Sequence, residues 1–179
     1  MAAGLSVCRC LTTINGISLE AEKLERFLPL AQKYDADIIA YLLRSDGQVP
    51  SDAAGRMEAA VELFGVLCDA GIAPDKIIID PIVAPLVWQE GNHQKMAVLE
   101  VSRTLPDLLG VKVRTIAGLS NLTTGAPDPE KRLRYQSTFL PMLEASGLDM
   151  ILTNAMDQRL QNIAETCRSI TEKTIFTWV

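Results

Sequence analysis

The sequence has few aromatic residues and a single histidine, and both shortages limit what the protein can do. Aromatic residues make up 5% of the chain and hydrophobic residues 48%, so the apolar content is mostly aliphatic. This balance is common in α/β proteins, whose buried strands are short aliphatic runs covered by helices. The only histidine is His93, which excludes a metal site built from several histidines and disfavours a Ser/His/Asp triad.

Cysteine is also scarce, and its spacing does not indicate a metal centre. The four cysteines include the close pair Cys8 and Cys10, and Cys-x-Cys without a second pair is not a zinc signature. We therefore expect no metal site, and we interpret the cysteines as buried thiols of a protein in a reducing compartment.

Long apolar runs and basic stripes are absent from the sequence as well. No apolar run reaches the roughly 18 residues that a membrane helix needs, and the N-terminus lacks the features of a signal peptide. The formal net charge is −5, which gives a nucleic-acid partner little electrostatic support. We expect a cytoplasmic protein that binds neither membranes nor nucleic acid.

Five short aliphatic runs alternate with amphipathic segments along the chain. The runs mostly lack polar alternation, which favours strands buried on both faces, as in parallel sheets. Strand starts recur roughly every 35 residues, the size of one βα unit. The predicted strands are Cys10–Ile14, Ile38–Leu43, Lys76–Ile79, Val111–Ile116 and Met150–Leu152.

Apolar residues at helical spacing predict a helix after each strand. Such stripes occupy Leu24–Ala31, Met57–Leu67 and Leu160–Cys167, and further helices are predicted at about 92–105 and 129–145. The fold class is therefore α/β. Units of this kind build either part of a closed (βα)8 barrel or an open doubly wound sheet, and periodicity alone does not choose between them.

Polar residues gather where the predicted strands end. Asn15 follows the first strand, Asp80 the third, and the string Gly118-Leu119-Ser120-Asn121 the fourth. In barrels and in open α/β sheets alike, binding and catalytic groups come from the carboxyl ends of the strands. Amides and carboxylates make hydrogen bonds in fixed patterns, which suits a flat heterocycle such as a pterin.

Each of these polar residues also has a purely structural interpretation. Asn15-Gly16 would serve as a turn, Asp80 as a helix cap or Asx turn, and Ser120-Asn121 as the cap of the next helix. Against this interpretation, all of them fall at the same end of successive strands. No glycine-rich phosphate fingerprint follows the first strand, and no nucleophile is paired with a base.

Several strings resemble the signature strand ends of a known family. Ile14–Ser18, Ile79–Ile82 and Gly118–Asn121 look like those of methyltetrahydrofolate:corrinoid/iron–sulfur protein methyltransferases. The folate domain of cobalamin-dependent methionine synthase is a more distant relative. Arg56 falls where the family has an Arg after its fifth strand, and the match covers nearly the whole chain.

The resemblance implies a partial (βα)8 barrel, made of strands four to eight with their helices. Residues 1–179 would form one pterin-binding domain without the first three βα units. Ala3–Leu5 resembles the end of the family's third helix, so we expect a truncated or split barrel, or a misassigned start codon. The family's strand-three Asp, which binds the pterin ring, has no counterpart in this chain.

The resemblance also implies a reaction, in which the N5-methyl group of methyltetrahydrofolate passes to a Co(I) corrinoid (cobalamin type) on a partner protein. Asn15, Asp80 and Asn121 would hydrogen-bond the pterin, with Asn121 near N5. Because a tertiary amine leaves poorly unless N5 gains a proton or a strong hydrogen bond, Asn121 is the expected catalytic residue. The pterin would be a folate or a methanopterin-like analogue.

The remaining expected site residues follow the fourth strand. Gly118 and Ser120 would shape the floor of the site, and Thr124 stands where the family often has a Gln. We also expect the chain to form a homodimer.

Two alternatives remain beside the methyltransferase. Dihydropteroate synthase is a related barrel, but its closing strands usually carry a Ser-Arg-Lys-like motif and an Arg-x-His, whereas this chain has Leu119-Ser120-Asn121 and no C-terminal histidine. The second alternative is a non-catalytic fragment that acts only by association with other chains. Five strands of an eight-stranded barrel leave two open sheet edges, which invite pairing.

Overall fold

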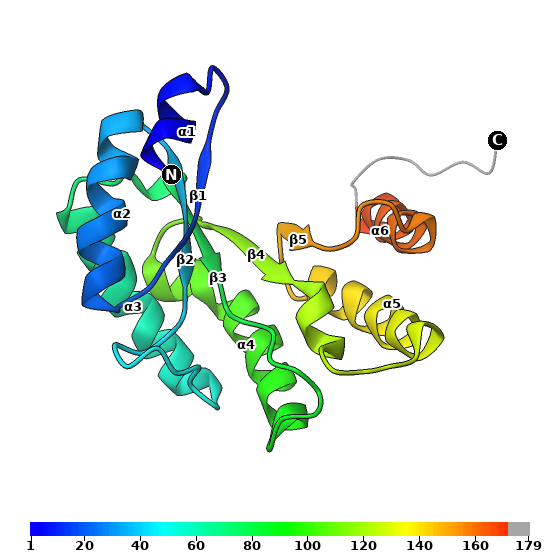
Figure 1. Cartoon of the computed structure of the whole chain (residues 1–179). Helices are drawn as coiled ribbons and strands as arrows, with labels where there is room; N and C mark the ends of the chain where they lie inside the picture. The colour runs from blue at the N-terminus through cyan, green and yellow to red at the C-terminus, as the bar shows by residue number, and fades with distance from the viewer. Residues whose placement is uncertain (172–179) are drawn as a thin grey trace.

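Five strands alternate with helices in the computed structural model, which describes residues 1–171 (Figure 1). The strands are β1 (Thr13–Ile17), β2 (Asp37–Tyr41), β3 (Ile77–Asp80), β4 (Arg114–Gly118) and β5 (Met150–Leu152). The helices are α1 (Ala2–Val7), α2 (Ala21–Tyr34), α3 (Ala53–Asp69), α4 (Gly91–Leu109), α5 (Pro129–Ala145) and α6 (Gln158–Thr171), with 3-10 turns η1 (Pro74–Lys76) and η2 (Leu119–Thr123).

The order of the strands decides between the two architectures that the sequence leaves open. All neighbouring strands are parallel, and their order in the sheet is β1-β2-β3-β4-β5. A doubly wound sheet reverses its strand order at a switch point, whereas consecutive barrel strands keep the order of the sequence. The described residues therefore form part of a (βα)8 barrel, and the predicted fold class is confirmed.

The two faces of the sheet are covered differently. Outward side chains such as Ile38 and Ile77 enter hydrophobic cores that they share with the helices. The inward side chains Ile39, Ile78 and Ile116 form a third cluster that contains only strand residues. Figure 1 shows the same layering, with helices α2 to α5 following the outside of the curved sheet. The inner face corresponds to the interior of a barrel.

The first strand begins later than the sequence predicts. The structure has β1 at Thr13–Ile17 rather than Cys10–Ile14. Asn15-Gly16 lies inside this strand, at a register shift in its pairing with β2, so the interpretation of this dipeptide as a simple turn is wrong. Ile17 is fully buried whereas Leu11 is 92% exposed, so burial determines which residues form the strand. A β-bulge at the register shift between Asn15 and Ile17 accommodates Asn15-Gly16 within the strand.

Two further differences from the sequence predictions concern β4 and the cysteines. The fourth strand is Arg114–Gly118 rather than Val111–Ile116, which places Gly118 inside the sheet. Cys8 and Cys10 are exposed, and the other two cysteines are half-buried, so the prediction of buried thiols is wrong. The two exposed cysteines precede the delayed start of β1 and lie outside the buried core of residues 1–171.

Side chains at the helix starts explain where two of the helices begin. Asp52 accepts a hydrogen bond from the backbone N–H of Gly55 at 2.8 Å and caps α3, and Asp128 caps α5 through the N–H of Glu130 at 2.9 Å. Gly110 ends α4 with φ at 66°, a conformation that favours glycine. Among residues 1–171, none of the helices combines the length and the apolar character needed to cross a bilayer.

Candidate functional site

Four predicted or newly found site residues share the inner face at the carboxyl ends of the strands. Asn15 pairs with Ile39 of the inner isoleucine cluster, and Tyr41 and Asp80 pair with each other two residues beyond that cluster. Gly118 lies two residues after Ile116 on β4, so it faces the same side. Parallel pairing therefore brings polar side chains from β1, β2 and β3, together with Gly118 of β4, to one end of the inner face.

Tyr41 joins the predicted residue Asn15 directly. Its hydroxyl donates a hydrogen bond to Asn15 Oδ1 at 2.5 Å. A Cβ atom on Gly16 would lie 2.5 Å from Tyr41 Cε2, so the ring packs against the backbone of β1 where only glycine fits. Tyr41 was not predicted as a site residue because the predicted strand continues to Leu43. The sequence does contain an indication of Tyr41. It is the only aromatic residue in the aliphatic run Ile38–Leu43, and it stands two residues after Ile39, so it faces the same side of the strand.

Tyr41 also lies beside Asp80, its partner across the pairing of β2 and β3. Burial raises the pKa of the Tyr41 hydroxyl, the negative charge of Asp80 raises it further, and the hydrogen bond to Asn15 lowers it. Tyr41 is therefore neutral at physiological pH and acts as a hydrogen-bond donor. Asn15, Tyr41 and Asp80 form one polar row across β1, β2 and β3.

Asp80 is the ionisable centre of this row. It is only 5% exposed, and its Oδ1 accepts a hydrogen bond from the backbone N–H of Ile82 at 2.8 Å, so the predicted Asx turn is present. Burial raises the pKa of Asp80 to about 6, against the opposing effects of the Ile82 N–H and the positive charge of Arg56. Among the described residues, its second oxygen accepts no hydrogen bond, so it has capacity left for a ligand.

Asn121 lies against the end of β4. It belongs to the 3-10 turn η2, and a Cβ atom on Gly118 would lie 2.8 Å from Asn121 Nδ2. Because that Cβ would point to the inner face, the Asn121 carboxamide covers the inner face at the end of β4. Ser120 and Asn121 lie inside η2, and Asp128 caps the next helix, α5, so the interpretation of Ser120-Asn121 as a helix cap is wrong.

Ser120 and Thr124 lie apart from this group. Both side chains are exposed. Ser120 lines a cavity of about 310 Å³ with Arg132 and Asn154, whereas Thr124 lines another of about 260 Å³ with Tyr135. The structure therefore brings Asn15, Asp80, Gly118 and Asn121 to one face and leaves Ser120 and Thr124 beside it.

The inner face is open among residues 1–171. Cavities of about 260 to 420 Å³ lie around α4, α5 and α6, and none of these is lined by Asn15, Asp80 or Asn121. The physical reason is that the described sheet has no facing strands to enclose this side. In the same part of the chain, no three His, Cys, Asp or Glu side chains come close enough together to hold a metal ion.

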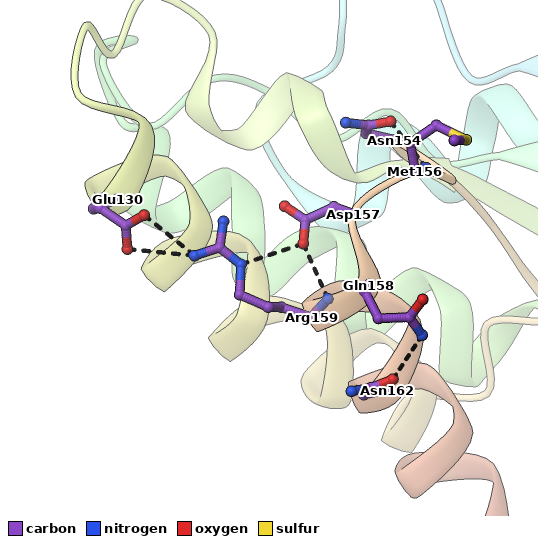
Figure 2. Close-up of polar contacts among 7 residues, drawn as sticks. All are labelled: Glu130, Asn154, Met156, Asp157, Gln158, Arg159 and Asn162. Carbon is purple, nitrogen blue, oxygen red and sulfur yellow. Dashed lines mark hydrogen bonds and ion pairs between the residues drawn. The ribbon is translucent and has the colours of Figure 1, made fainter.

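The polar residues after β5 are used by local structure instead. Figure 2 shows Arg159 between Glu130 of α5, at 3.2 Å, and Asp157, whose carboxylate also accepts the backbone N–H of Arg159 at 3.0 Å. The Asn154 carboxamide accepts the N–H of Met156 at 3.0 Å. These contacts fold the turn before α6 and tie it to α5, so this strand end has a structural role.

Comparison with known proteins supports the architecture. No protein-family model matches the chain. A 7,8-dihydropteroate synthase from Vibrio fischeri superposes with a TM-score of 0.70 at 16% identity, covering 98% of this chain. A dihydropteroate synthase from Clostridium difficile, solved in the presence of pteroic acid, gives 0.67 at 18% identity over 96%. A Yersinia pestis synthase with a pterin–sulfa conjugate gives 0.63 at 14% identity over 84%.

The chain is shorter than these structural neighbours. It spans 66% of the Vibrio fischeri protein, 64% of the Clostridium difficile protein and 58% of the Yersinia pestis protein. At such low identity the likeness establishes the shared barrel fold, and the chemistry of the site has to be argued from its residues.

Proposed function

We propose that the carboxyl ends of β1, β3 and β4 bind a reduced pterin through Asn15, Asp80 and Asn121. The observation that carries the proposal is that these three groups, predicted from sequence, face the same side of the sheet at the same end. A pterin presents two adjacent N–H donors, from its 2-amino group and N3. A carboxylate accepts such a pair with both oxygens, and Asp80 has one oxygen without a partner among the described residues.

The state of Asp80 also fits a pterin ligand. With its pKa raised to about 6 by burial, the carboxyl group is mostly charged at neutral pH. A charged acceptor makes shorter and stronger hydrogen bonds than a neutral one, and burial adds to this effect. Tyr41 and Asn15 extend the row, so a flat ring can meet acceptors and donors in one plane.

For the reaction, we propose transfer of the N5-methyl group of methyltetrahydrofolate, or of a related tetrahydropterin, to a corrinoid on a partner protein. The corrinoid would supply the nucleophile that takes the methyl group. The task of this chain is to hold the ring and to stabilise the proton or hydrogen bond that develops on N5. Asn121 suits that task because its carboxamide can donate or accept. Its exposure also leaves the methyl side open to a partner.

Dihydropteroate synthesis is the second candidate, and the structural neighbours favour it. The synthases above share the fold over most of this chain. Both candidates place a pterin at the same strand ends, so they differ in the co-substrate. Incubation with para-aminobenzoate and a pterin diphosphate would yield dihydropteroate only under the second candidate. Loss of the methyl group from methyltetrahydrofolate in the presence of cob(I)alamin would occur only under the first.

Substitution of Asn121 tests the methyl-transfer proposal. We expect Asn121→Ala to lower kcat about 100-fold with methyltetrahydrofolate and cob(I)alamin, because a positioned proton-transfer group typically contributes 10²–10⁴-fold. Asn162→Ala removes the same side chain from the exposed surface of α6 and serves as the matched control. Equal kinetics for the two variants would reject the assigned role of Asn121.

Calorimetric titration with methyltetrahydrofolate separates these candidates from the non-catalytic fragment. A folded chain that binds no pterin would favour the fragment that acts only by association. The homodimer stays a prediction, which sedimentation equilibrium of the same sample checks.

A further inference from the structure

We propose that Arg56 is a positioning residue of the candidate site, which holds the Asp80–Ile82 turn so that the Asp80 carboxylate is presented to the pterin. This inference rests on the proposed pterin-binding function. It concerns a residue that contacts neither the inner face nor the proposed ligand directly, since Arg56 lies on α3 and is fully buried.

The guanidinium group of Arg56 joins three separate segments. Its Nε donates to the carbonyl of Pro50, 3.0 Å away, in the loop before α3. Its Nη1 donates to the carbonyls of Pro81 and of Ile82, the latter at 2.6 Å. Its Nη2 donates to Gln94 Oε1 on α4 at 3.2 Å. The planar, multidentate guanidinium therefore connects the loops after β2 and β3 with the start of α4.

The turn that Arg56 holds is an unusual one. Ile82 has φ at 62°, the left-handed region, which a β-branched residue rarely adopts. Both backbone groups of Ile82 are bonded, its N–H to Asp80 Oδ1 and its carbonyl to Arg56 Nη1. Such a conformation persists where the surroundings determine it from several sides. Without Arg56, Ile82 is free to relax, and its N–H no longer fixes the orientation of the carboxylate.

Arg56 also acts on the charge of Asp80 through space. The two side chains form no direct ion pair, yet the positive charge lowers the pKa of Asp80 against the larger effect of burial, which leaves it at about 6. Three other groups interact electrostatically with this pair. The charge of Asp80 raises the pKa of Tyr41 on β2, and the charge of Arg56 lowers the pKa of Lys95 on α4. The charge of Asp52, before α3, raises the pKa of Arg56. Removal of Arg56 lets burial raise the pKa of Asp80 further.

Placement of a cation here has a cost that packing alone would not require. Burial lowers the pKa of Arg56 to about 10, and its hydrogen bonds go to carbonyl and amide oxygens rather than to a carboxylate. Arg56 offsets part of this cost because it donates hydrogen bonds to the carbonyls of Pro50, Pro81 and Ile82. Its location behind the only buried carboxylate of the described strand ends is what points to a role in the site.

The test compares Arg56→Met, which removes the charge and the donors, with Arg56→Lys, which keeps the charge but not the planar fork. The first readout is the pKa of the Asp80 carboxyl, followed by carbon-13 NMR in the free protein, which needs no pterin. We expect Arg56→Met to move the titration upward by about one pH unit and Arg56→Lys to leave it close to that of the wild type. An unchanged titration in Arg56→Met overturns the inference.

The second readout is the affinity for methyltetrahydrofolate between pH 5 and pH 9. At pH 7 we expect Arg56→Met to bind at least 10-fold more weakly, with part of the loss recovered at pH 9. Arg56→Lys is expected to bind about 10-fold more weakly at every pH, because the turn is loosened while the charge remains. Wild-type affinity for both variants overturns the inference, whereas absence of pterin binding by the wild type rejects the proposed function instead.

A third variant keeps the inference testable if Arg56→Met does not fold. Gln94→Leu removes only the acceptor of Nη2 and leaves the charge in place. We expect a smaller loss of pterin affinity, of about 3-fold, with the pH midpoint unchanged. Pterin affinity equal to the wild type in both Gln94→Leu and Arg56→Lys would contradict a positioning role.

Discussion

The two ends of the same sheet use polar residues in opposite ways. At the amino ends of the strands, charged and hydroxyl groups bond to one another. At the carboxyl ends, Tyr41 donates to Asn15, but Asn15, Asp80 and Asn121 keep hydrogen-bonding capacity that the described residues do not use. In barrels of this type, the amino end serves stability and the carboxyl end serves ligands. The contrast indicates that polar groups which destabilise the fold are tolerated at the carboxyl end, where a ligand would bind.

At the amino end, contacts cross several strands. Arg114 at the start of β4 reaches Asp37 at the start of β2, at 2.7 Å, and the carbonyl of Asp75 at 2.6 Å. Thr115 exchanges hydrogen bonds with Asp149, which precedes β5, through the side chains at 3.0 Å and the Asp149 N–H at 3.1 Å. These bonds link the amino end of β4 to the start of β2 and to the segments that precede β3 and β5.

At the carboxyl end, the buried carboxyl group of Asp80 works against stability. Its pKa is raised above the ordinary value by burial, so the folded state binds a proton more tightly than the unfolded state does. Perturbed groups of this kind cluster at functional sites. The two ends should therefore differ in how each polar group changes the free energy of unfolding.

The largest effect is expected for Asp80, with pH as the variable. Because the folded-state pKa of about 6 lies above the ordinary value of 3.8, stability is lost as pH rises from about 4 to 7, by up to about 3 kcal/mol relative to Asp80→Asn. Urea unfolding of both proteins across this range measures the difference. Parallel pH curves would show that Asp80 is not buried as described.

An intermediate loss is expected for Thr115→Val at the amino end. The side chain is 2% exposed, and the change leaves the Asp149 N–H without its acceptor while removing a donor to the Asp149 carboxylate. We expect a decrease of about 2 kcal/mol in the free energy of unfolding and unchanged pterin affinity. A variant that keeps its stability but loses pterin affinity would reverse the proposed division between the two ends.

The smallest effect is expected for Arg114→Met. Its side chain is 40% exposed, so solvent screens the ion pair with Asp37 and the loss should be about 1 kcal/mol. Thermal unfolding at low and high salt checks the prediction, since the wild-type advantage should shrink as salt increases. Arg103→Met, on the exposed surface of α4, removes a charge without a recorded ion pair and serves as the control.

Much of the fold was predictable because it depends on burial patterns along the chain. The aliphatic runs Ile38–Leu43 and Lys76–Ile79 gave β2 and β3 to within two residues, since strands buried on both faces need unbroken apolar sequence. The edge strand β1 was misplaced because Asn15-Gly16 has the composition of a turn. Its position depends on burial of Ile17 against the helices, which is not local information.

The candidate site was predictable only in part. Asp80 and Asn121 follow strand ends in the sequence, so their approach to one edge of the sheet could be expected. Tyr41 was hidden within a strand, and Arg56 lies in a helix, with its partners Ile82 and Gln94 distant along the chain. Such contacts arise from packing between βα units, so local sequence patterns do not predict them.

The sequence by itself determined that short aliphatic strands alternate with amphipathic helices and that amides and a carboxylate follow the strands, because side-chain periodicity and strand burial are local properties. Only the tertiary structure decided that the strands keep their sequence order in a partial barrel, that Tyr41 bonds to Asn15 and lies beside Asp80, and that Arg56 bonds to the turn that follows Asp80. These features depend on which segments meet in space, and burial of the cores at the interfaces between units selects that arrangement.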